Sequence, residues 1–223
     1  MKIYYPNEKH IFTIIILHGM YGHSSNYETL VDNILNISKN IKIILPNSPI
    51  RDIDWPAGKE YNVRSWYNYF TARNGEMQHD EIDKLHFEQQ CNRIEALIEK
   101  ELKVITSGNI ILIGESQGGT IVADLSISLK YRLAGYVLID SIFMDNILSS
   151  KINVENMKKN IYIYSSENDE VYTLEFQKRS VNRLHLEKYI QDWFIDKDTK
   201  HCEVGPNRNK FILSIITSVF NLD

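Results

Sequence analysis

Residues 110–121 read IILIGESQGGTI, and they are the clearest indication of the fold in this sequence. Four apolar residues run directly into a polar, glycine-rich turn, which opens a segment with helical spacing. A strand, a Gly-x-Ser-x-Gly turn and a helix in this order are typical of a nucleophile elbow. Its glycines let the chain pass close to its neighbours, while the serine is held in a strained conformation with its hydroxyl exposed. The stretch therefore predicts a reactive serine, Ser116, at the end of a buried strand.

The same turn has a plainer interpretation as a glycine-rich connection, including one that binds phosphate. The phosphate-loop pattern G-x-x-x-x-G-K-[ST] is absent from the sequence, which disfavours the second form of that interpretation.

The rest of the chain alternates between strand and helix patterns. Apolar, β-branched runs are continuous rather than alternating, so both faces of each strand should be buried, as in a central parallel sheet. These runs occupy residues 11–17, 41–45, 109–113, 136–140, 160–164 and 188–195. Helical spacing occupies residues 26–39, 86–102, 116–131, 171–184 and 210–220. This alternation predicts an α/β fold with a mostly parallel sheet and helices on both faces. Residues 46 to about 82 are expected to be a long irregular segment.

Length and composition agree with a globular enzyme and exclude several other classes. We expect the 223 residues to form one domain, residues 1–223. A net charge of −4 with scattered basic residues argues against a nucleic-acid partner. The apolar runs are too short for a membrane span, and the N-terminus lacks an apolar signal core. Cys91 and Cys202 are not spaced as a pair or a metal site, so a cytoplasmic protein with free thiols is expected.

The loop after the first strong strand, LHGMYGHSS (17–25), follows the pattern of an oxyanion loop. An α/β-hydrolase stabilises its oxyanion with two backbone N–H groups, one after the nucleophile and one from an early loop. Gly19 lets the chain turn inward, so the N–H groups of Met20 and Gln117 are the candidates. His18 is interpreted as a structural histidine that orients this loop.

An acid and a base follow later strands. Asp169 lies in the loop after the strand at 160–164, although Glu167, Glu170 and Asp140 are alternatives for the acid. His201 lies in the loop after the last strand. The chain order Ser116, Asp169, His201 is that of α/β-hydrolase triads.

Six segments together resemble the phospholipase/carboxylesterase family of α/β-hydrolases, which includes the acyl-protein thioesterases. They are LHGMYG (17–22), ILPNSPIRDI (44–53), VRSWYN (63–68), IILIGESQGG (110–119), ENDEVYTLEFQKRSVNRL (167–184) and KHCEV (200–204). The resemblance covers nearly the whole chain. Departures from the family pattern are Glu115 before the serine, Asn68 in place of a frequent Asp, and Lys200 before the histidine.

The resemblance implies a serine hydrolase of the α/β-hydrolase fold that cleaves acyl esters or thioesters without a metal or cofactor. Its partner would be an acylated small molecule, a lysolipid or an acylated protein; the oligomeric state stays open. A peptidase, a lipase and a non-catalytic ligand-binding protein are the alternatives.

The substrate pocket is expected from the aromatic-rich segment after the second strand. Trp55, Trp66 and Tyr67 are the candidate lining residues, because acyl sites are mostly apolar. For Trp66 and Tyr67, packing of the segment onto the domain is an equally open interpretation. Residues 74–85 are hypothesised to be a mobile flap over the entrance.

Overall fold

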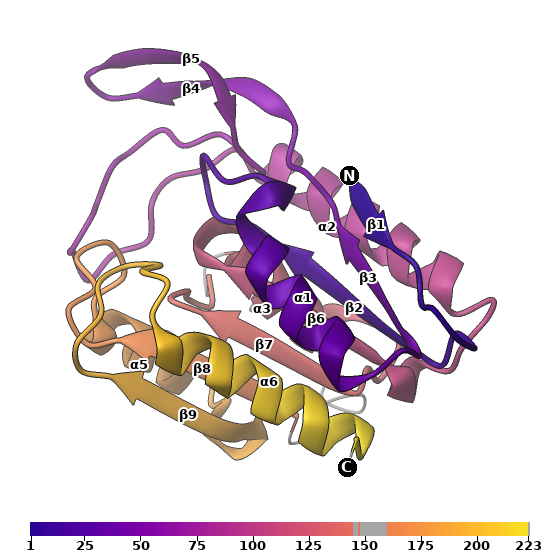
Figure 1. The fold of residues 1–223 in the computed structure, drawn as a ribbon. Coiled ribbons are helices and arrows are strands. Elements are labelled where there is room, and N and C mark those ends of the chain that lie inside the picture. Colours follow the sequence, from indigo (N-terminus) through magenta and orange to yellow (C-terminus); the bar gives the residue numbers. More distant parts are fainter. Residues whose placement is uncertain (145–146, 148–159, 223) are drawn as a thin grey trace.

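The centre of the molecule is a seven-stranded sheet (Figure 1). The computed structural model describes residues 1–144, 147 and 160–222. The strands follow the order β1-β3-β2-β6-β7-β8-β9, and every neighbouring pair is parallel except β1 with β3. Their bounds are β1 Lys2–Tyr4, β2 Phe12–Leu17, β3 Ile41–Leu45, β6 Ile110–Glu115, β7 Gly135–Ile139, β8 Ile161–Ser166 and β9 Ile190–Asp196. The predicted mostly parallel sheet is confirmed.

Both faces of the sheet are buried, as its continuous apolar runs require. Along β2, Ile15 packs into one hydrophobic cluster, while Ile14 and Ile16 pack into the other. Successive side chains of a strand point to opposite faces, so a run of isoleucines supplies both clusters at once.

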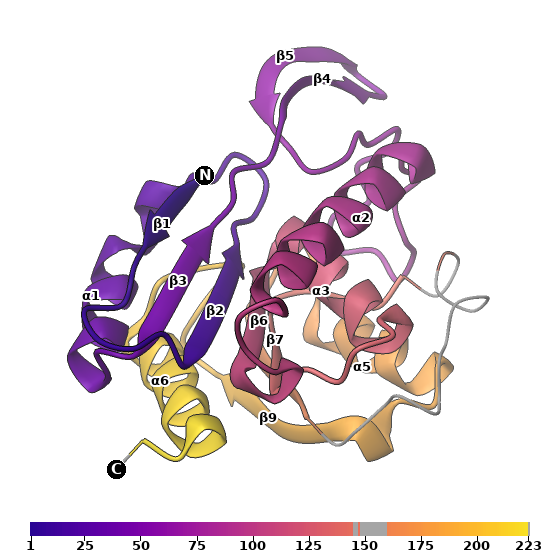
Figure 2. The same ribbon diagram turned by 90° about the vertical axis from the view of Figure 1, so that its right-hand side faces the viewer.

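Helices cover the two faces unequally (Figure 2). Helices α1 and α6 lie on one face, and α2, α3 and α5 lie on the other. Their bounds are α1 Glu28–Ile37, α2 Lys84–Glu101, α3 Ser116–Ser128, α5 Leu174–Arg183 and α6 Pro206–Phe220. Helix α6 begins four residues before its apolar run, because Pro206 at its first turn has a backbone suited to helix initiation. Among the described helices, none is both long enough and apolar enough to cross a membrane.

Two features correct the expectations from sequence. The segment expected to be irregular contains an antiparallel hairpin of β4 Ile50–Trp55 and β5 Gly58–Arg64, and it projects beyond the end of the sheet (Figures 1 and 2). Most of its residues are charged or exposed, so it has no apolar run to reveal it. Strand β1 was also not expected; it is only three residues long and pairs at the sheet edge.

Candidate active site

The elbow places Ser116 between β6 and the first turn of α3. Its backbone φ is 47°, in the left-handed region that non-glycine residues rarely adopt. The flanking glycines are required by close backbone contacts. A Cβ atom on Gly114 would lie 2.5 Å from the Gly118 carbonyl oxygen, and one on Gly118 would lie 2.5 Å from the carbonyl oxygen of His18. The glycines of GESQGG are therefore a steric requirement of this turn.

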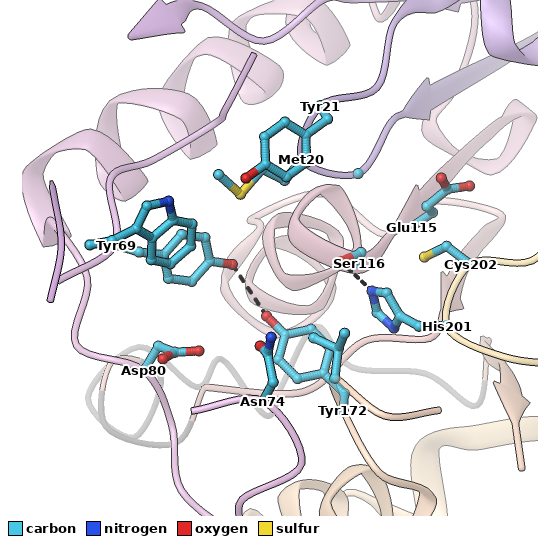
Figure 3. Close-up of a pocket in the computed structure, with 13 residues that line it drawn as sticks. Met20, Tyr21, Tyr69, Asn74, Asp80, Glu115, Ser116, Tyr172, His201 and Cys202 are labelled. Atoms are coloured by element: carbon cyan, nitrogen blue, oxygen red, sulfur yellow. Dashed lines mark hydrogen bonds between the residues drawn. The ribbon is translucent and has the colours of Figure 1, made fainter. Parts of the chain in front are cut away.

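Ser116, His201 and Asp169 form a continuous hydrogen-bonded chain. The Ser116 Oγ lies 2.9 Å from His201 Nε2 (Figure 3). His201 Nδ1 lies 2.8 Å from Asp169 Oδ2. The three residues are far apart in sequence, but they follow β6, β8 and β9, whose carboxyl ends lie at one edge of the sheet. The structure thus brings together all three predicted residues in the predicted order of contacts.

The two carboxylate oxygens of Asp169 have different hydrogen-bond partners, one set in its own loop and the other the imidazole of His201. Its Oδ1 accepts hydrogen bonds from the N–H groups of Val171 and Tyr172, each at 2.8 Å, whereas Oδ2 faces His201. Both alternative glutamates, Glu167 and Glu170, are exposed. Asp140, the remaining alternative, is buried, but its carboxylate accepts hydrogen bonds from backbone and hydroxyl donors and not from the imidazole. Asp169 therefore has the geometry of the orienting acid.

The environment of His201 favours the protonated form of its imidazole. Burial lowers its pKa, but the hydrogen bond and the negative charge of Asp169 outweigh burial, so the pKa is raised above 6.5. The charges of Asp140 and Glu115 act in the same direction. This environment suits a group that must accept a proton from a serine hydroxyl.

Glu115, the unusual residue before the serine, is paired with a buried arginine. Its carboxylate lies 2.7 Å from the guanidinium of Arg208 on α6, and the Arg208 side chain is only 4% exposed. The positive charge of Arg208 opposes the negative charge that Glu115 places beside the nucleophile.

The loop that carries Met20 is held by a neutral histidine. His18 Nδ1 donates to the Gly19 carbonyl at 2.6 Å, and Nε2 accepts from the Ser48 N–H at 3.0 Å. Burial lowers the pKa of His18 to about 4, which keeps the ring neutral, and the two hydrogen bonds fix its tautomer. His18 thus orients the loop, in agreement with its predicted structural role. A Cβ atom on Gly19 would lie 3.3 Å from the Cβ of Ser116, so the loop passes directly beside the nucleophile.

The backbone and the side chain of Gln117 make different interactions. Its N–H belongs to the first turn of α3, where helix N–H groups have no intrahelical acceptor. The buried side chain points away and binds residues 65–67: Oε1 accepts from the Trp66 N–H at 2.8 Å, and Nε2 donates to the Ser65 hydroxyl at 2.8 Å and to the Tyr67 carbonyl at 3.0 Å. The N–H groups of Met20 and Gln117 are thus carried by two segments that meet at Ser116.

The three candidate lining residues are placed differently. Trp55, on the hairpin, lines a cavity of about 250 Å³ beside Ser116. Trp66 and Tyr67 do not line this cavity, because the chain turns into the core after β5 and buries both completely. Trp66 donates from its indole to the His18 carbonyl at 2.7 Å, and the Tyr67 hydroxyl lies 2.8 Å from that of Thr120. Trp66 and Tyr67 therefore pack their segment onto the domain, which is the second of the two interpretations given for them.

The other lining residues differ in how far the sequence indicated them: Met20 was expected only as an oxyanion donor, Tyr69 belongs to the aromatic-rich segment, and Tyr172 was not identified. Met20 and Tyr69 lie opposite the hydrogen-bonded pair of Ser116 and His201, and the Tyr69 hydroxyl is 3.3 Å from that of Tyr172 (Figure 3). Tyr172 was expected to be helical, but α5 begins only at Leu174. The one sequence signal for Tyr172 was its nearness to Asp169. The cavity is lined by Gly19, Met20, Tyr21, Trp55, Tyr69, Asn74, Asp80, Glu115, Ser116, Val171, Tyr172, His201 and Cys202.

The hypothesised flap, residues 74–85, contributes Asn74 and Asp80 to the cavity. It is fastened at several points: the Gly75 N–H donates to the Val171 carbonyl at 3.0 Å, and Arg179 donates to the Met77 carbonyl at 3.2 Å. Its mobility stays a prediction. In the described parts of the chain, no cluster of three His, Cys, Asp or Glu side chains is arranged to hold a metal ion.

Comparison with known proteins agrees with this geometry. The family model described as phospholipase/carboxylesterase matches residues 1–205. Acyl-protein thioesterase 1 homolog 2 of Dictyostelium discoideum is 30% identical over 165 residues, which cover 73% of this chain and 72% of that protein. The crystal structure of Zea mays acyl-protein thioesterase 2 is 16% identical and has a TM-score of 0.74, covering 96% of this chain and 98% of that one. Arabidopsis thaliana SOBER1 gives a TM-score of 0.78 at 19% identity, covering 94% of this chain and 99% of that one.

The two solved structures are too distant in sequence to indicate more than a shared α/β-hydrolase fold, whereas the family match spans most of the chain. The resemblance inferred from the six sequence segments is confirmed. The chain belongs to the phospholipase/carboxylesterase family, and it is a serine hydrolase of the ester and thioester class.

Proposed function

We propose that the protein cleaves acyl esters or thioesters through an acyl-serine intermediate on Ser116. His201 takes the serine proton as Oγ attacks the acyl carbonyl, and then gives it to the leaving alcohol or thiol. Asp169 holds the imidazole in the required tautomer and stabilises its charged form. The N–H groups of Met20 and Gln117 stabilise the oxyanion. Water then attacks the acyl-enzyme by the same route and releases the acid.

The observation that supports this proposal most is the hydrogen-bonded chain from Ser116 Oγ through His201 to Asp169, at 2.9 and 2.8 Å. It joins a strained nucleophile, a base whose pKa is raised and a buried carboxylate. These are the three parts that nucleophilic activation of a serine requires.

The acyl group is proposed to lie in the cavity beside Ser116, against Met20, Trp55, Tyr69 and Tyr172. These side chains are mostly apolar, as an acyl chain requires. The relative from Dictyostelium discoideum is named an acyl-protein thioesterase, which makes an acylated protein one candidate beside lysolipids and small esters. Cys91 and Cys202 are not joined in a disulfide within the described residues, which supports the proposed cytoplasmic location.

A fluorophosphonate probe with mass-spectrometric mapping tests the proposal. We expect one equivalent of probe on Ser116, none on the Ser116→Ala protein, and hydrolysis of acyl esters reduced by several orders of magnitude in that variant. Ser128→Ala, at the other end of α3, is the matched control and should be labelled like the wild type. Near-normal turnover by Ser116→Ala would contradict the proposal. A folded wild type that takes no label and hydrolyses no activated ester would favour the non-catalytic alternative.

A further inference from the structure

Cys202, the residue after His201, has a backbone conformation that needs outside support. Its φ is 55°, which is a left-handed conformation for a residue with a side chain. The loop has no regular secondary structure around it, so the orientation of the His201 ring depends on what holds this backbone. Two buried side chains, from opposite directions, bind the two polar groups of the Cys202 backbone.

Asp140 binds the N–H of Cys202. This carboxylate follows β7, is 0% exposed, and accepts from the Cys202 N–H at 2.8 Å. It also accepts from the N–H of Ser166 at 2.6 Å and from the Ser166 hydroxyl at 3.0 Å. The Ser166 hydroxyl in turn accepts from the hydroxyl of Thr199, which lies on the histidine loop. Asp140 therefore joins the loop of the base to the end of β8, from which the loop of Asp169 departs.

Arg208 binds the carbonyl of Cys202. Its Nη1 donates to that oxygen at 3.1 Å, while its Nη2 lies 2.7 Å from the carboxylate of Glu115. The guanidinium thus donates a hydrogen bond to one oxygen and forms an ion pair with another. One side chain therefore links the residue before the nucleophile to the residue after the base.

We propose that Asp140 and Arg208 are positioning residues that clamp Cys202 and thereby hold the imidazole of His201 against Ser116. The inference rests on the proposed function, because it concerns how the base of that mechanism is oriented. It also gives Glu115 a role: its carboxylate anchors the arginine. Neither side chain would touch the substrate carbonyl. They act through the backbone of Cys202.

The test compares Asp140→Asn and Arg208→Lys with the wild type. The amide introduced by Asp140→Asn has one acceptor oxygen for three donors, and its NH₂ group would face other donors. The ammonium introduced by Arg208→Lys retains the charge opposite Glu115 but lacks the planar fork of the guanidinium. Because a small misplacement of a catalytic group can cost about 10²-fold in rate, we expect kcat to fall by about 10- to 100-fold in each variant, with KM within about twofold. The rate of fluorophosphonate labelling at Ser116 should fall in parallel. The double variant should lose less than the product of the single losses, since both act on Cys202.

Two controls and a pH profile separate positioning from general stability. Asp124→Asn replaces a buried aspartate that accepts from Ser128, and Arg183→Lys replaces an exposed arginine in the last turn of α5; both should retain wild-type kcat. In Asp140→Asn the acid limb of kcat/KM should move to lower pH, because a negative charge that raises the pKa of His201 is removed. In Arg208→Lys, which keeps its charge, the limb should stay in place. The ionisable groups around His201 are Asp169, Asp140, Glu115, Arg208, Cys202 and Tyr172.

The experiments distinguish failure of the clamp proposal from failure of the proposed function. Absence of label on wild-type Ser116 would count against the triad itself. Normal label on the wild type, together with unchanged kcat and labelling rates in both variants, would overturn the clamp alone. A variant with reduced thermal stability but unchanged kcat would assign its residue to folding and would also overturn the clamp at that position. If Asp140→Asn does not fold, Arg208→Lys decides the question.

Discussion

At Ser116 the backbone adopts a φ of 47°, a conformation that costs a non-glycine residue about 1–3 kcal/mol. The surroundings hold it there: β6 leads in, α3 leads out, and glycines on both sides allow close contact with the neighbouring chain. The strain directs Oγ toward His201 Nε2, so the folding energy of the sheet and helix supports the orientation of a single hydroxyl.

The activity should depend on the protonation of His201. A protonated imidazole cannot accept the serine proton, so kcat/KM should fall as the pH drops through the pKa of His201, which is raised above 6.5. Asp169→Asn removes the hydrogen bond and charge that raise this pKa. Its acid limb should therefore lie at lower pH than that of the wild type, and kcat should fall on the order of 10³–10⁴-fold. A pH–rate series on both proteins tests this; an acid limb that does not move would contradict it.

Asp140 should make the folded protein less stable as the pH rises. Burial, followed by the charge of Asp169, raises its pKa from 3.8 to about 6 in the folded state. Between these values the folded state binds more protons than the unfolded state, so stability declines with increasing pH. The shift of about two pKa units corresponds to a change on the order of 3 kcal/mol.

Denaturant unfolding of the wild type and Asp140→Asn from pH 4 to pH 7 measures this effect. The free energy of unfolding of the wild type, minus that of the variant, should decrease as the pH rises. A difference that is independent of pH would show that the Asp140 carboxyl titrates alike in the folded and unfolded chain.

At the scale of elements, the start of α3 connects two surfaces. The N–H groups of its first turn have no intrahelical acceptor, while the side chain of Gln117 binds residues 65–67. Trp66 continues this connection, because its indole N–H binds the His18 carbonyl. The elbow, the oxyanion loop and the end of the hairpin are therefore a single hydrogen-bonded unit.

Replacing Gln117 with Met should disturb this unit while keeping a side chain of similar length. The change leaves the buried Trp66 N–H without a partner, and it removes one hydrogen bond each from the Ser65 hydroxyl and the Tyr67 carbonyl, which still bond to each other at 2.6 Å. A buried polar group without a partner costs about 1–3 kcal/mol, and each further lost hydrogen bond costs about 0.5–1.5 kcal/mol. We expect the free energy of unfolding to fall by at least about 2 kcal/mol, with a lower kcat because the oxyanion loop loses support. Gln89→Met, at an exposed position of α2, is the control and should change stability by less than about 0.5 kcal/mol. Equal stability of the two variants would contradict the argument.

At the scale of the whole molecule, the cavity is assembled from segments that are far apart in sequence. The hairpin supplies Trp55, the segment after it supplies Tyr69 and Asp80, and the loop before α5 supplies Tyr172. Each lies beyond the carboxyl ends of the parallel strands, where α/β folds place their ligands. The volume of about 250 Å³ is set by how these segments pack against one another.

Trp55→Ala should shift the preference of the enzyme toward longer acyl chains. The change enlarges the cavity, and each methylene accommodated in an apolar pocket is worth about 1–3 kcal/mol in discrimination. We expect kcat/KM for a longer chain relative to a short one to rise by at least about tenfold. Tyr61→Ala, on the same hairpin but 66% exposed and outside the cavity, is the matched control. A panel of nitrophenyl esters of increasing length gives the measurement; identical profiles for both variants and the wild type would contradict the proposed acyl site.

The parallel sheet, its covering helices and the position of the elbow could be predicted from the sequence. These are local properties: a continuous isoleucine-rich run must be buried on both faces, and GESQGG after such a run fits one tight turn. The sequence also indicated the order of Ser116, Asp169 and His201, because side chains that follow parallel strands meet at one edge of the sheet. The hairpin was not predicted, because its residues are mostly polar and because the pairing of β4 with β5 cannot be read from either strand alone.

Contacts between residues that are distant in sequence could not be predicted in this way and depend on the packing of the complete fold. Trp55, Trp66 and Tyr67 come from one aromatic-rich segment, yet Trp55 lines the cavity while the other two are fully buried behind it. Nothing near Glu115 in the sequence indicated that Arg208 on α6 pairs with it, nor that Asp140 binds the backbone beside His201. Local patterns report on burial and turn geometry, whereas partners of a buried charge are chosen by the packing of the complete fold. That packing placed two opposite charges around Cys202, next to the base.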